Sequence, residues 1–125
     1  SGYMVDADIC FEFLGFVFFY KRLAELIPYH FTIVDCGAAY NAQSFYFTKY
    51  KKYIAIQPHI EYIFMSPNCE RFDGTTGQFI NSELYSQLDL NTTFAICSYV
   101  PPWYGEDSIE LCRKNFKNVF TYYPA

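Results

Sequence analysis

Short, mostly apolar runs recur along the chain, and each is followed by a polar or turn-forming residue. The clearest are 31–36 (FTIVDC), 52–57 (KYIAIQ) and 94–99 (FAICSY). Strands that are apolar on both faces are typical of parallel sheets, because helices cover such sheets on both sides. This feature argues against a one-sided antiparallel sheet and indicates an α/β architecture.

Helical signals separate these strands. Apolar residues at steps of three and four predict a helix over 8–27, which Pro28 ends. The other expected elements are helices over 41–49 (with Asn41 as N-cap), 60–66, 79–84 and 107–116, and strands over 69–72 and 118–123. With right-handed crossovers, they predict an α/β fold. It is a three-layer Rossmann-like sandwich of about five mostly parallel strands in the order 3-2-1-4-5, preceded by an N-terminal helix.

Composition fits one globular domain over residues 1–125. The chain has 125 residues, 52% of them hydrophobic, which is the opposite of a disordered composition. Residues 1–3 resemble the remnant of an expression tag. The net charge is -4 and the only basic cluster, Lys49, Lys51 and Lys52, is short. Nucleic acid is therefore not expected as a direct electrostatic partner. The 22% of aromatic residues includes 13 Tyr, which indicates a ring-lined rim, pocket or interface.

Cysteine usage and the apolar N-terminal run bear on location. Five Cys without a CxxC pair argue against a disulfide framework, and two distant His give no metal site. The run 9–20 contains Glu12 and is shorter than the roughly 20 residues that span a membrane. It also lacks the features of a signal peptide. We expect a cytoplasmic protein with no membrane partner and no metal.

Polar residues follow the predicted strands at Asp35, Gln57, Asp73 and Ser98-Tyr99. The carboxyl ends of parallel strands meet at one edge of a sheet, where ligands bind in open α/β folds. Asp35 fits two roles, a functional group before the turn at Gly37 or an N-cap of the following helix. The sequence therefore predicts a ligand site at this edge.

Three segments carry a more specific pattern. Segment 33–41 (IVDCGAAYN) is a predicted strand that ends in Asp before a turn. Segment 54–58 (IAIQP) is the end of a second predicted strand. In segment 95–103 (AICSYVPPW), Pro-Pro-Trp follows another predicted strand. Their order and spacing resemble those of class I S-adenosylmethionine-dependent methyltransferases. The last segment is similar to the fourth-strand motif of amino-methyltransferases. The resemblance spans residues 8–123.

The resemblance implies a binding site for S-adenosylmethionine. By position, its cofactor-binding residues are Asp35, Gly37, Ala39, Gln57, Asp73 and Ser98, and the substrate or partner surface is Tyr99, Pro101, Pro102, Trp103 and Tyr104. No residue is singled out as catalytic.

The motifs also depart from the family pattern. Ala39 and Asn41 replace glycines of the turn. Gln57 replaces the acidic residue that accepts the ribose hydroxyls. Val100 stands where the family has an acceptor for the target amine. A neutral amide is a weaker acceptor than a carboxylate. These departures predict little or no methyl transfer.

Three functions fit this pattern. The first is a small methyltransferase-like domain that binds S-adenosylmethionine or a related nucleoside. The second is a catalytically inactive protein-binding module, such as an inhibitor or accessory protein from a bacterial phage or mobile element, docking on a basic partner. The third is an active methyltransferase completed by a partner or by homodimerisation. We rank cofactor binding without transfer above catalysis.

Overall fold

Five parallel strands form one sheet in the order β3-β2-β1-β4-β5. The structure is a computed structural model that describes residues 19–39, 41–58, 64–98, 100 and 105–122. The strands are β1 (Thr32–Cys36), β2 (Lys52–Ile56), β3 (Cys69–Phe72), β4 (Thr93–Ser98) and β5 (Asn118–Tyr122). This topology confirms the strand order and direction predicted from the sequence.

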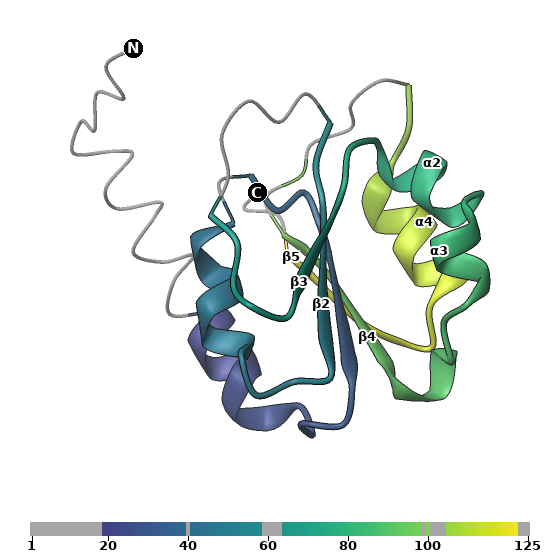
Figure 1. The fold of residues 1–125 in the computed structure, drawn as a ribbon. Helices are drawn as coiled ribbons and strands as arrows, with labels where there is room; N and C mark the ends of the chain where they lie inside the picture. The colour runs from purple at the N-terminus through teal and green to yellow at the C-terminus, as the bar shows by residue number, and fades with distance from the viewer. Residues whose placement is uncertain (1–18, 40, 59–63, 99, 101–104, 123–125) are drawn as a thin grey trace, which may run out of the picture.

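Helices lie on both faces of the sheet (Figure 1). Helical residues 19–26 and the 3-10 helix η1 (Ala42–Phe47) cover one face. The other face carries α2 (Thr76–Ile80), α3 (Glu83–Ser86) and α4 (Ser108–Asn115), and a short 3-10 turn, η2 (Leu90–Thr92), leads into β4. The molecule is therefore the predicted three-layer Rossmann-like α/β sandwich.

Each face of the sheet has its own apolar core, because successive strand residues point to opposite sides. Ile33 packs with Tyr20 and Phe47 on the face of helix 19–26. Its neighbour Val34 packs with Phe79 on the face of α2 and α4. All five residues of β1 are buried, as expected for a central strand covered on both sides.

Two predicted helices differ in the structure. Segment 41–49 forms the 3-10 helix η1, and Asn41 makes no side-chain cap because it adopts a left-handed backbone with φ 65°. The single helix expected over 79–84 is two short helices. Thr75 and Gln78 form a capping box at the start of α2, and Ser82 caps a new helix, α3. Both N-caps are strong start signals, so two short helices form where one was expected.

Other predictions are confirmed or lie outside the described residues. Helix α4 begins after Asp107, whose side chain accepts a hydrogen bond from the Glu110 N–H at 3.2 Å. Residues 64–66, expected to end a helix, have no regular secondary structure. The helix predicted over 8–27 is present over 19–26, and its first part, most of 60–66 and the loop 101–104 lie outside the described residues.

Cysteines 36, 97 and 112 are buried free thiols that pack as small apolar residues in the core. Among the described residues, no group of three or more His, Cys, Asp or Glu side chains is arranged to hold a metal ion. Within the same part of the chain, no helix is long and apolar enough to cross a membrane.

Candidate functional site

The strand register brings most of the predicted cofactor-binding residues to one edge of the sheet. Cys36 is paired with both Ile56 and Cys97, and Ile56 is paired with Phe72. The residues that follow them therefore share the C-terminal edge: Gly37, Gln57, Ser98 and Asp73. The five residues of the predicted partner surface, Tyr99, Pro101, Pro102, Trp103 and Tyr104, lie outside the described residues.

The loop between β1 and η1 has three described residues with positive φ angles, and only one of them is glycine. Gly37, Ala39 and Asn41 have φ angles of 87°, 51° and 65°. A left-handed conformation costs an ordinary residue about 1–2 kcal/mol, and Asn tolerates it better than most. The Asn41 amide also donates to the Phe64 carbonyl oxygen at 2.8 Å and to the Cys69 sulfur at 3.2 Å. Ala39 and Asn41 thus hold a backbone conformation that glycine adopts more readily.

Hydrogen bonds to the end of β2 fix this loop. The backbone N–H groups of Gly37 and Ala38 both donate to the Ile56 carbonyl oxygen, at 2.9 and 3.0 Å. The Ala39 N–H donates to the side-chain oxygen of Gln57 at 3.1 Å. Gln57 therefore acts as a support for the loop as well as a candidate ligand contact.

Val100 covers Gly37. A Cβ atom added to Gly37 would lie 2.2 Å from the Val100 Cγ2 atom, so only glycine fits beneath this side chain. Val100 precedes the Pro-Pro-Trp segment and has no side-chain acceptor. The first and last motifs of the sequence therefore meet in the structure, through an apolar contact.

Asp35 lies in a buried polar network rather than at the open edge. Its Oδ1 accepts from the Tyr20 hydroxyl at 2.7 Å, and its Oδ2 accepts from the Gln43 amide at 2.8 Å and from the Tyr53 hydroxyl. The Tyr20 hydroxyl is also 3.2 Å from the Ser98 hydroxyl oxygen. All five side chains are buried. The N-cap alternative for Asp35 is wrong, because η1 starts after Asn41.

Burial has the largest effect on the pKa values of this network. It raises the pKa of Asp35 above its ordinary value, although hydrogen bonds from Tyr53, Gln43 and Tyr20 act in the opposite direction. Burial and the neighbouring Asp35 charge raise the pKa values of Tyr20 and Tyr53, so both stay protonated donors. The network holds β1, β2, η1 and helix 19–26 together around one carboxyl group.

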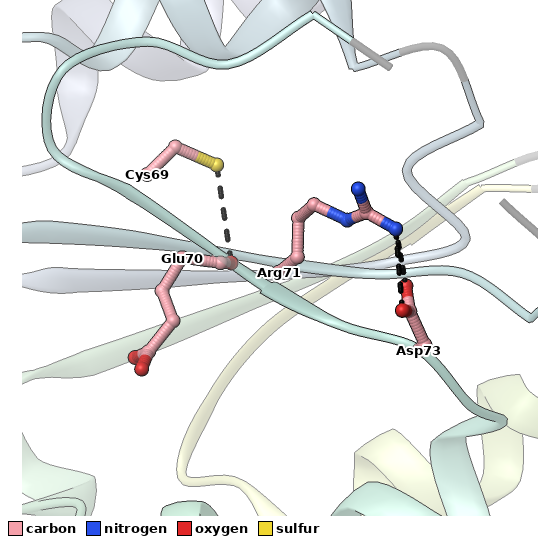
Figure 2. A network of polar contacts seen from close by, with 4 residues as sticks. All are labelled: Cys69, Glu70, Arg71 and Asp73. Atoms are coloured by element: carbon pink, nitrogen blue, oxygen red, sulfur yellow. Dashed lines mark hydrogen bonds and ion pairs between the residues drawn. The ribbon is translucent and has the colours of Figure 1, made fainter. Parts of the chain in front are cut away.

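Asp73 lies at the other end of the site, on the solvent side of β3. Figure 2 shows Arg71 and Asp73 pointing toward one another. Arg71 Nη2 donates to both Asp73 oxygens, at 2.9 and 3.2 Å. The Asp73 side chain is 61% exposed. Glu70 points to the opposite side of β3 in Figure 2 and pairs with Lys52.

Sequence reasoning missed three members of the Asp35 network: Tyr20, Gln43 and Tyr53. A signal for them exists. Tyr20 lies on the predicted apolar helix face and Tyr53 lies within a predicted buried strand, so each buried hydroxyl needs a partner. Asp35 is the carboxylate within the adjoining strand. Matching buried donors to buried acceptors points to these contacts.

Comparisons with known proteins agree with this architecture. No protein-family model matches the chain, and no curated protein matches it in sequence. Its fold matches the solved structure of a putative type II methyltransferase from Anaeromyxobacter dehalogenans, with a TM-score of 0.60 and 14% sequence identity. The likeness is one of fold. The match covers 87% of this chain and 48% of the Anaeromyxobacter protein, so the chain spans about half of that protein's length.

Proposed function

We propose that this methyltransferase-like domain binds S-adenosylmethionine or a related nucleoside at the C-terminal edge of its sheet, with little or no methyl transfer. The observation that carries the proposal is the loop after β1. Among the described residues of this loop, positive φ angles occur at Gly37, Ala39 and Asn41, the positions where the family resemblance places glycines. Strained backbone persists where the surrounding structure holds it, and such strain clusters at functional sites.

The positions of the other candidates support binding more than catalysis. Ala39 is exposed and Gln57 is half-buried, so both can contact a ligand at the edge. Asp73 is exposed at the end of the adjacent strand. Val100 packs over Gly37, and the family resemblance places it where amine methylation needs an acceptor, which its side chain lacks. The site can therefore hold a ligand. However, Val100 provides no acceptor that would activate an amine for methylation.

Calorimetric titration with S-adenosylmethionine and adenosine tests this function. Gln57→Glu provides the sharpest variant, because its carboxylate can keep the bond from the Ala39 N–H and accept ribose hydroxyls more strongly. We expect this variant to tighten nucleoside binding about fivefold. Gln87→Glu, an exposed site at the end of α3, is the matched control and should change nothing.

The negative outcomes are distinct. If neither the wild type nor Gln57→Glu binds any nucleoside, the proposed function is wrong. Incubation with a labelled methyl donor and cell extract tests the absence of transfer. Methyl incorporation above that of a heat-inactivated sample would show an active methyltransferase instead.

A second candidate function is protein binding, as an inhibitor or accessory module. Exposed apolar side chains gather on helix 19–26 and η1 and in the segments that follow them, notably Leu26, Tyr29, Phe45 and Tyr46, which are 60%, 54%, 51% and 40% exposed. Lys49 lies 5.8 Å from the centre of the Tyr29 ring. Apolar surface of this kind is typical of interaction sites.

Co-purification from host cells tests the second function. A specific partner should be lost with Tyr29→Ser and retained with Lys114→Ser, since Lys114 is also exposed but lies on α4, on the opposite face of the sheet. Equal recovery with both variants would remove the support that the exposed side chains give to this function.

A further inference from the structure

Within the part of the chain that the structure describes, the C-terminal edge of the sheet has a closed part and an open part. The closed part lies over β1 and β4, where Asp35 and Ser98 are buried beneath the Tyr20 hydroxyl and Gly37 is covered by Val100. The open part lies over β2 and β3. There Gln57 is half-buried, and Ala39 and Asp73 are exposed.

Three described groups in the closed part that could otherwise hold a charged ligand, the Asp35 carboxyl and two backbone N–H groups, already have partners. Both oxygens of Asp35 accept hydrogen bonds from neighbouring side chains. The Gly37 and Ala38 N–H groups, which could otherwise bind a carboxylate, donate to the Ile56 carbonyl oxygen. An amino-acid group brings both an ammonium and a carboxylate, and each needs compensating partners when it leaves water.

The open part suits an uncharged polar ligand. The Gln57 side chain carries an amide, which can donate as well as accept, and its oxygen has a second lone pair beyond the bond from Ala39. The charge of Asp73 is matched by Arg71. A neutral diol such as that of ribose can exchange hydrogen bonds with Gln57 at no cost in buried charge.

We propose that this site selects an uncharged ribonucleoside, and that the amino-acid group of S-adenosylmethionine adds nothing to the binding affinity. The inference rests on the proposed function and narrows its ligand. Tyr20 and Val100 are the specificity-determining residues, because they close the part of the edge that a charged tail would need. Gln57 and the backbone at Ala39 hold the nucleoside.

Calorimetry with four probes tests the ligand class: adenosine, 5′-methylthioadenosine, S-adenosylhomocysteine and S-adenosylmethionine. We expect the two uncharged nucleosides to bind the wild type at least as tightly as the two that carry an amino-acid group. Tighter binding of S-adenosylhomocysteine than of adenosine, by more than about twofold, overturns the inference but supports the proposed function. Binding of none of the four overturns both.

A double variant tests the two closing residues. Val100→Ala with Tyr20→Phe uncovers Gly37 and removes one hydrogen-bond donor from Asp35. We expect the ratio of the S-adenosylhomocysteine Kd to the adenosine Kd to fall about threefold or more. The control is Val119→Ala with Tyr85→Phe, two residues that pack in the core on the opposite face of the sheet from Tyr20; the Tyr85 hydroxyl also donates one hydrogen bond, to the Asn115 carbonyl oxygen, and the ratio should stay unchanged.

Circular dichroism establishes that both double variants are folded. If the first is not, Val100→Ala alone takes its place, since Val100 is only half-buried. An unchanged ratio in the folded variant, or an equal fall in the control, shows that Tyr20 and Val100 do not set the specificity.

Discussion

A carboxylate in the middle of a sheet is costly unless hydrogen bonds satisfy it. Asp35 has three side-chain donors, two of them tyrosines on separate elements. One residue therefore ties together segments that are far apart in the sequence. Such a network restricts how the strands and helices can pack, because a shift of any member leaves a buried polar group unpaired.

The amide variant Asp35→Asn removes the charge of this network while keeping its hydrogen bonds, so that the effect of the charge on stability can be measured. Its oxygen can accept from Tyr53 and Gln43, and its nitrogen can donate to Tyr20, whose hydroxyl then donates to Ser98. Because the pKa of Asp35 is raised in the folded state, protonation of Asp35 favours folding. That stabilisation is complete below the unfolded pKa of about 3.9 and is lost as the pH rises through the folded value.

We therefore expect the stability of Asp35→Asn, relative to the wild type, to increase as the pH rises and then to level off. Urea unfolding of both proteins over a pH series measures this difference, and the titration of all other groups cancels. A relative stability that falls with rising pH would mean that the hydrogen bonds outweigh burial.

At the scale of elements, the strands and α4 were predictable, whereas η1, α2 and α3 differ from the expected helices. The three central strands β1, β2 and β4 are mostly apolar runs ended by a polar or turn residue, and tertiary packing reinforces that local signal. Residues 41–49 carry a helical pattern, yet the left-handed Asn41 and the bonds of the loop shorten the segment to the 3-10 helix η1. For the site, strand ends predicted which residues share the edge. They did not predict that Asp35 is buried, since this depends on Tyr20 and Tyr53.

The loop after β1 offers a test of stored strain. Ala39→Gly should stabilise the protein by about 1 kcal/mol, because glycine adopts the left-handed conformation that costs alanine energy. Ala42→Gly, three residues later and within η1, is the control and should destabilise it by about 0.5–1 kcal/mol. Chemical denaturation measures both. Destabilisation by Ala39→Gly would mean that the loop does not hold alanine under strain.

At the scale of the whole molecule, two apolar cores share one sheet. Alternate residues of the central strands serve opposite cores, so that Ile33 and Ala55 belong to one and Val34 and Ile54 to the other. Neither core can be lost without freeing strands that the other needs. This arrangement predicts that the two faces unfold together, as small single domains usually do.

Two matched phenylalanines test that coupling. Phe47 and Phe79 are fully buried, one in each core. Truncation of either to alanine should cost about 3–5 kcal/mol, through lost apolar burial and the cavity left behind. If the sheet couples its faces, each variant unfolds in a single transition. Its midpoint should be the same by far-ultraviolet circular dichroism and by near-ultraviolet circular dichroism of the aromatic side chains. The two faces would not be coupled if, in Phe79→Ala, α2–α4 unfolded first while the near-ultraviolet signal of the aromatic side chains around Phe47 was retained. The Asp35 network of the candidate site lies on the Phe47 face. In that case, the core on this face would be sufficient to keep the site folded.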